Sequence, residues 1–357
     1  MSETTKKKGI FRYHGIILNS WPFMLAIMVL LSVRLAIRNP GLVELYFSKG
    51  IYPFIAKGFS SASNLVTFSL WDFFWILTIL LLLCGLILAA FKKIKSGWYV
   101  LRVAQLLAIL YSFFYLSWGF NYFRPGIETR LGWERPKLNE QTFRLIMNSI
   151  INNTNNSYIP ISPSEYSIID NLIEESYYKN STKLGINYPG GTRRPKKMVF
   201  SSYFAKSGIS GYFGPFFNEV HWNSYLLPME YPFLLAHEKA HQFGISNEAE
   251  ANLAAFIICT TSDDQRLQYS GYFSMLHYFL KDAERMNDYI KKIDKRVIED
   301  IQFRHQYYYS LQNKTLKKVQ TAANDVYLKS NNIKMGVKNY NQVVSLVISW
   351  YHNSDTN

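Results

Sequence analysis

The stretch LLAHEKAHQFGISNEAEANLAAF, from Leu234 to Phe256, places two histidines four residues apart, with a glutamate between them. On an α-helix, residues four apart project from the same face, so His237 and His241 could bind one tetrahedral metal ion together. Glu238 follows the first histidine, where its carboxylate could take a proton from a metal-activated water. The stretch therefore predicts a zinc-binding helix of the HExxH type.

The residues around the motif favour a buried helix with a defined end. The segment "PFLLA" before the motif is apolar, and Gly244 can end the helix in a left-handed conformation. The alternative is an ordinary helix whose two histidines are hydrogen-bonded in the core. A chance HExxH is rare, so the zinc interpretation is preferred.

A catalytic zinc ion usually has three protein ligands and one open position. Asn247 suits a helix N-cap, and Glu250 would then complete a capping box from the third helical position. Glu248 would remain free to bind the metal, while Asn252 on the same helix face could orient a ligand histidine. Glu250 is the alternative third ligand, and Glu248 could instead be a first-turn carboxylate that favours the helix dipole.

The sequence "HEKAH" followed by "EAEAN" resembles the gluzincin metallopeptidases, in which a second helix carries E-x-x-A-D or E-x-x-A-N. The resemblance implies that His237, His241 and Glu248 are metal ligands. It also implies that Glu238 is the general base and that Asn252 orients a metal-ligating residue without binding the metal itself. The chain departs from the pattern in two ways: the interval between the motifs is short, and Asn stands at the supporting position instead of Asp.

Three stretches in the first 120 residues are long and apolar enough to cross a bilayer. They span residues 16–33, 73–91 and 103–120. A single one could be a buried core helix, but three uncharged runs predict a membrane anchor over residues 1–120. The aromatic first loop, residues 39–71, could lie along the membrane interface or pack against the soluble domain.

Basic residues near the ends of the spans predict the orientation. They gather in the N-terminal tail (Lys6, Lys7, Lys8, Arg12) and in the short second loop (Lys92, Lys93, Lys95, Arg102), and are more thinly spread in the first loop (Arg34, Arg38, Lys49, Lys57). The tail and the second loop are therefore expected in the cytoplasm. Residues 121–357 would then form an extracytoplasmic domain.

Charge and cysteine content exclude two classes of partner. The net charge is +14, but the basic residues are scattered, and two of their three clusters flank apolar stretches. Membrane topology explains those clusters, so we expect no nucleic-acid partner. The two cysteines, Cys84 and Cys259, lie in an apolar run and in a helical stretch, so we expect no disulfide.

The part after the spans is expected to be an α-dominant α+β domain, zincin-like, with a small β-sheet just before the HExxH helix. "MVFSSYF" (198–204) and "GISGYFGPFFNEVHWN" (208–223) are rich in β-branched and aromatic residues, which is typical of strands. The helical patterns cover residues 139–152, 164–179, 264–280, 282–311, 315–330 and 340–352.

The second strand-like segment lies where gluzincins place the edge strand that pairs with an extended substrate. Its glycines would let a peptide backbone approach closely, which makes Gly211 a candidate for substrate binding. Tyr212 and Glu219 are further candidates. An edge that is simply covered by a loop is the alternative.

A resemblance to a second family covers nearly the whole chain. The three spans, "WGFNYFRP", "GISGYFGPF", the HExxH with "EAEAN", and "VYLKSNN" resemble an uncharacterised bacterial membrane family, a domain of unknown function. The resemblance implies a multi-pass protein of the bacterial cytoplasmic membrane whose HExxH suggests zinc dependence.

Together these features predict a zinc peptidase held in the lipid bilayer, with one zinc ion per chain and a peptide or protein substrate. The main alternative is a non-proteolytic zinc-binding membrane protein, such as a sensor or an assembly factor. A third is an inactive interaction protein. An intact Glu238 favours the enzyme, because a structural zinc site needs no base.

Overall fold

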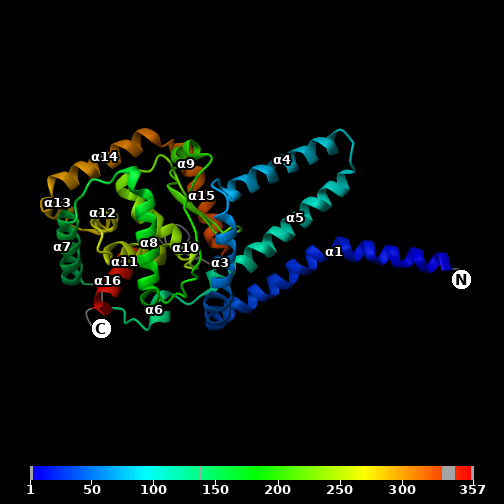
Figure 1. The fold of residues 1–357 in the computed structure, drawn as a ribbon, viewed down its shortest axis with the longest axis horizontal. Helices are drawn as coiled ribbons and strands as arrows, with labels where there is room; N and C mark the ends of the chain where they lie inside the picture. Colours follow the sequence, from blue (N-terminus) through cyan, green and yellow to red (C-terminus); the bar gives the residue numbers. More distant parts are fainter. Residues whose placement is uncertain (1–2, 137–138, 332–341, 355–357) are drawn as a thin grey trace.

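The computed structural model describes residues 3–136, 139–331 and 342–354. Figure 1 shows a mostly helical domain from which three long helices project to one side. Each of these helices contains a segment long and apolar enough to cross a membrane: Ser20–Arg38 in α1 (Glu3–Arg38), α4 (Leu70–Ala90) and α5 (Ser96–Ser117). Candidate spanning helices therefore lie at the three predicted places, with boundaries that differ by a few residues.

The third span differs most from its predicted bounds of 103–120. Helix α5 begins seven residues earlier, at Ser96, and ends at Ser117, after which the chain tightens into the 3₁₀ turn η2 (Gly119–Phe123). A Cβ at Gly119 would lie within 3.0 Å of both Phe114 and Tyr115, so the tight turn needs glycine there. The span therefore passes directly into the soluble domain without a flexible connector.

The first loop packs against the soluble domain. It forms α2 (Pro40–Leu42), the π-helical η1 (Val43–Ile51) and α3 (Tyr52–Ser63). The Tyr52 hydroxyl donates to the Gln242 carbonyl at 2.7 Å, at the end of the motif helix. The aromatic residues of this loop therefore connect the first span to the domain that carries the motif.

The soluble domain is dominated by helices. They are α6 (Ile127–Leu131), α7 (Glu140–Asn156), α8 (Tyr166–Asn180), α9 (Ser201–Ser207), α10 (Tyr231–Gln242), α11 (Glu248–Thr260), α12 (Gln265–Asp282), α13 (Met286–Ile290), α14 (Lys295–Leu311), α15 (Lys314–Ser330) and α16 (Val343–Ser354), with short 3₁₀ turns η3 (Pro163–Glu165), η4 (Thr182–Leu184) and η5 (Pro228–Glu230). Residues 340 and 341, where the last predicted helix begins, lie outside the described part of the chain.

Helix α11 forms the centre of the hydrophobic core. Its residues from Ala249 to Cys259 are all buried, because the run "ANLAAFIIC" is apolar apart from Asn252. Helices α10, α12, α8 and α16 pack around it. The acidic start of this helix is thereby fixed against the end of α10.

The sheet is small and mixed. Strand β3 (Glu219–Trp222) lies in the middle, parallel to β1 (Lys196–Lys197) and antiparallel to β2 (Gly211–Gly214). The strand prediction for residues 208–223 is confirmed, and β2 forms one edge of the sheet.

Two predicted elements are wrong. Residues 198–204 were expected in a strand, but Ser201–Ser207 form α9. The extended chain ends before this helix, at Val199, whose N–H donates to the Asp72 carboxylate at 2.8 Å. The helix expected over 282–311 is divided into α13 and α14. Asp294 caps the second of these by accepting from Arg296 N at 2.8 Å, so a new helix starts there.

A buried carboxylate joins the membrane helices to the sheet. Glu219 accepts from Ser63 Oγ at 2.7 Å at the end of α3, and from Trp71 N at 2.9 Å at the start of α4. It also forms an ion pair with Lys196 of β1, and both side chains are 1% exposed. One side chain therefore connects three elements that are distant in the sequence.

We expect Glu219→Ala to destabilise the protein strongly, because it leaves the Lys196 ammonium buried without its partner. Breaking a buried ion pair from one side costs about 3–5 kcal/mol. Thermal unfolding of the detergent-solubilised protein measures this change. Glu175→Ala is the matched control, since its ion pair with Lys179 is exposed and its loss should leave the melting temperature unchanged. Equal effects of the two substitutions would contradict this role of Glu219.

Candidate metal centre

The motif helix α10 has a defined start and end. The turn η5 leads into it, and Pro232 occupies its first turn, where a missing N–H costs nothing. The helix ends at Gln242, and Gly244 follows with φ +86°, as predicted. The chain can therefore reverse at once toward α11.

Helix α11 begins at the predicted N-cap. The Asn247 side chain accepts from Ala249 N at 2.9 Å and from Glu250 N at 3.1 Å. Glu248 is consequently the first residue of the helix, and its carboxylate faces the end of α10.

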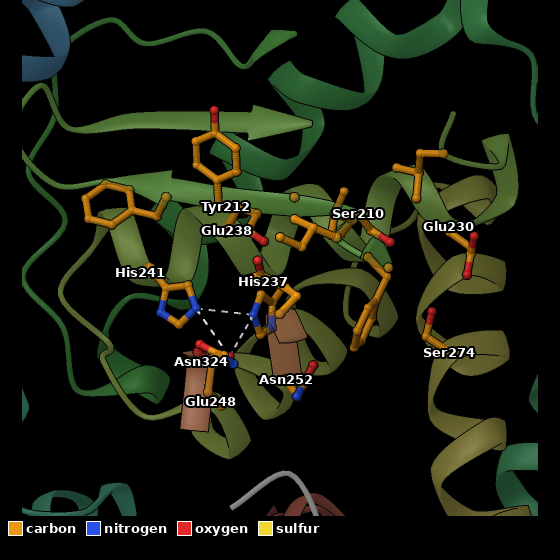
Figure 2. Close-up of a pocket in the computed structure, with 18 of the residues that line it drawn as sticks. Ser210, Tyr212, Glu230, His237, Glu238, His241, Glu248, Asn252, Ser274 and Asn324 are labelled. Atoms are coloured by element: carbon orange, nitrogen blue, oxygen red, sulfur yellow. Dashed lines mark hydrogen bonds and ion pairs between the residues drawn. The ribbon is translucent and has the colours of Figure 1, made fainter. Parts of the chain in front are cut away.

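His237, His241 and Glu248 form a compact cluster that could hold a metal ion (Figure 2). The two histidine Nε2 atoms are 3.2 Å apart, and Glu248 Oε2 lies 3.3 Å from the first and 3.6 Å from the second. Zinc–nitrogen and zinc–oxygen bonds of about 2.0–2.1 Å give tetrahedral ligands a mutual spacing of about 3.3–3.4 Å. The three donor atoms fit that spacing.

The surrounding backbone orients one of these rings. His241 Nδ1 lies 2.7 Å from the Ile245 carbonyl oxygen, so Nδ1 carries the hydrogen and donates it. The Nε2 lone pair is then free to bind a metal, as in many metal-binding histidines. His237 Nδ1 is buried and has no hydrogen-bond partner among the described residues.

Neighbouring groups keep the Glu248 carboxyl in its ionised form. Burial alone would raise the pKa of the Glu248 carboxyl, but the charges of His241 and His237 lower it well below its usual value. Burial likewise opposes the charged form of His241, while Glu248 and Glu238 raise the pKa of that imidazole. Glu248 therefore presents an anionic carboxylate, the form that binds cations.

Glu238 is buried between the cluster and strand β2 (Figure 2). Burial raises the pKa of its carboxyl above the usual value, although the neighbouring histidines oppose this shift. A Cβ at Gly211 would lie 2.8 Å from Glu238 Oε1. The glycine at this position therefore leaves room for the carboxylate beside the edge strand.

The cluster opens into a cavity of about 660 Å³. Among the predicted substrate-binding residues, Gly211 and Tyr212 line the cavity, although the Tyr212 hydroxyl donates to Asp72. Glu219 does not line it. Its carboxylate contacts Ser63, Trp71 and Lys196. Glu219 therefore has the structural role described above and not the predicted role in substrate binding.

The predicted capping box of Glu250 is not formed, and this carboxylate is separate from the cluster of His237, His241 and Glu248. Glu250 Oε1 instead accepts from Ile127 N at 3.0 Å, and Oε2 lies 3.1 Å from Arg130 Nη1. Both side chains of this ion pair are buried. Glu250 therefore fastens α6 to α11, and Glu248 is the carboxylate that the structure brings to the histidines.

Asn252 lies one turn after Glu248 and lines the cavity. Its side chain interacts with the Tyr278 hydroxyl, and its Nδ2 is buried without a partner. No hydrogen bond joins Asn252 to His237 or His241 in the described part of the chain. The predicted support of a ligand histidine is thus not seen in this arrangement.

Several residues of the cavity were not predicted from the sequence. Helix α15 contributes Lys317, Gln320, Thr321, Asn324 and Tyr327, which line the cavity together with residues of the motif helix. The Tyr122 hydroxyl donates to that of Tyr327 at 3.1 Å. Burial raises the pKa of both phenols, and the charge of Glu248 adds to this shift. The cavity residues of α15 recur mostly every three positions, but nothing in the sequence indicates that this face of the helix meets the motif.

Glu248→Ala and Glu250→Ala should have different consequences although the residues are two apart. Glu250→Ala leaves Arg130 buried and unpaired, which should lower the free energy of unfolding by about 3–5 kcal/mol. Glu248→Ala should weaken metal binding by about tenfold or more. Thermal unfolding in the presence of a chelator and metal titration of the folded protein separate these effects. An empty site in folded Glu250→Ala, with a full site in Glu248→Ala, would identify Glu250 as the ligand instead.

Comparison with known proteins places the chain in a family. No curated protein and no solved structure matches it. A family described as "Protein of unknown function (DUF3810)" matches residues 47–348, from the first loop through the second and third candidate spans, the histidine–glutamate cluster and α15 into α16. The chain belongs to this family, in agreement with its whole-length resemblance to a three-span family of unknown function.

Proposed function

We propose that the protein is a membrane-anchored zinc peptidase. The observation that carries this proposal is the spacing of 3.2–3.6 Å among the donor atoms of His237, His241 and Glu248, with Glu238 beside them. Two imidazoles and a carboxylate on an open cavity are typical of catalytic zinc sites that keep one position free. A bound zinc ion would lower the pKa of water and polarise a peptide carbonyl.

Residues of the chain itself would transfer the proton and position the substrate. Glu238 would accept the proton of the attacking water at its carboxylate and return it to the leaving amine nitrogen. Strand β2, at the edge of the sheet and along the cavity, could pair with an extended peptide and hold it beside Glu238. Gly211 supports both roles, because it leaves space for the carboxylate and permits a close approach of backbone.

The cavity and the base favour this function over a non-proteolytic zinc protein. A sensor or assembly factor that uses zinc structurally would be expected to have a closed site with four protein ligands. Here three candidate ligands face a cavity of about 660 Å³, and a buried carboxylate lies next to them.

We also propose that residues 121–357 face the extracytoplasmic side of the bacterial cytoplasmic membrane. The support is the distribution of basic residues, which gather in the N-terminal tail and in the second loop. With three spans, the domain after α5 lies on the side opposite to the N-terminus.

Purified protein should contain about one zinc ion per chain. His237→Ala or His241→Ala should lose it, since one imidazole and one carboxylate are too few ligands. Glu238→Gln should retain both zinc and fold but lose hydrolysis of unstructured peptides, because the amide cannot accept the proton. Metal analysis and a peptide cleavage assay measure these outcomes. Wild-type protein that binds no stoichiometric metal would refute the proposal.

The orientation is tested with a reporter enzyme that is active only outside the cytoplasm. Fused after Asn357, the reporter should be active, since it follows the proposed extracytoplasmic domain. Inserted near Lys95, in the second loop, it should be silent. The opposite pattern would place the site in the cytosol.

A further inference from the structure

The candidate site lies at the membrane end of the soluble domain. We infer that it acts on peptide segments tethered to the same membrane, close to the point where they leave the bilayer. This inference rests on the proposed peptidase function and adds the class of substrate. Three sets of contacts carry it.

The first contact joins the third span to the motif helix. Helix α5 has 22 residues, and its length of about 33 Å matches the hydrocarbon thickness of about 30 Å. Trp118 follows its last residue directly, and its indole Nε1 donates to the His241 carbonyl at 2.9 Å. The Trp118 side chain also lines the cavity. A residue at the membrane boundary thus touches a candidate metal ligand, with no stalk between them.

The second set of contacts holds the edge strand at the same level. Phe216, in the turn after β2, packs against Phe74 and Trp75 of α4 and against Phe113 of α5, with ring centroids 5.4–6.2 Å apart. A Cβ at Gly214 would lie 2.9 Å from the Trp71 ring. The end of β2 therefore packs between the start of α4 and the end of α5. Tryptophan at these ends is typical of the membrane interface.

The third set comes from the segments that follow the first and third spans. Tyr52 of α3 donates to the Gln242 carbonyl, and a Cβ at Gly244 would lie 3.0 Å from the Tyr52 ring and 3.1 Å from Asn121 Oδ1. The end of the motif helix is thus fixed directly on the membrane part. Figure 1 shows α7 and α13 at the opposite end of the domain, away from the spans.

These contacts determine how far the candidate site lies from the membrane boundary. Trp118 is one peptide unit beyond the span, so the end of the motif helix at His241 lies within about 10 Å of the membrane boundary. An extended chain advances about 3.3 Å per residue, so a segment would reach the cluster within about three to five residues of its own span. A segment tethered to the same membrane is cleaved faster because its local concentration at the site is high. A folded soluble protein would have to bring a loop up to the bilayer surface.

The test uses full-length, zinc-loaded protein reconstituted in liposomes with a tethered peptide library. Each library member has one apolar span of about 20 residues, followed by a randomised segment of about ten residues. A second library inserts a proline-rich spacer of about ten residues, which holds the segment about 31 Å away. A third inserts a flexible Gly/Ser spacer of equal length, whose ends average about 17 Å apart. A fourth lacks the span, and Glu238→Gln is the inactive control.

We expect the directly tethered library to be cleaved at least tenfold faster than the proline-spaced and the untethered ones, with the Gly/Ser library between them. Mass spectrometry should place the cuts within about ten residues of the span. Equal cleavage of the direct and proline-spaced libraries, or of the tethered and untethered ones, would overturn the inference while leaving the peptidase intact. If wild-type protein cleaves no library, the proposed peptidase function itself fails.

Discussion

The reversal of the chain between α10 and α11 is the constraint on which the candidate site depends. Gly244, with φ +86°, allows the chain to turn, and the Ile245 carbonyl then accepts from the His241 imidazole. Asn247 starts the next helix immediately afterwards. Within a few residues, this turn brings Glu248 to the two histidines and fixes the orientation of one of the rings. A longer or looser connection would separate the three donor atoms.

A buried ionic network fixes the direction of the motif helix. Lys239 lies inside HExxH and is 1% exposed, paired with Asp170 at 2.7 Å and with Glu174, both on α8. Arg193 adds a second cation to Glu174 at 2.8 Å. Burial opposes the charge of Lys239, but the two carboxylates outweigh it and raise the pKa of its ammonium group. Such a network resists rotation of α10, because any rotation would leave a charge buried without its partner.

The soluble domain and the membrane helices form a continuous structure around the site. The first span leads through α3 to the end of α10, the second span starts at the Glu219 carboxylate, and the third ends at His241. The edge strand and the motif helix are thus both anchored at the membrane boundary. This arrangement gives a physical reason for the proposed peptidase to be membrane-bound: the candidate spanning helices are part of the scaffold of the site.

Local features of this protein were readable from the sequence alone. The three spans follow from uninterrupted apolar runs, and the histidine pair, the Gly244 turn and the Asn247 cap follow from interactions within a few residues along the chain. Only the tertiary structure showed that Glu248, and not Glu250, lies beside the histidines, because Arg130 and Ile127, which contact Glu250, are more than a hundred residues away. The tertiary structure also showed which residues contact Glu219, and that α15 lines the cavity. Such contacts depend on how segments that are distant in the sequence pack together. This packing leaves no periodic pattern in the sequence around either contacting residue.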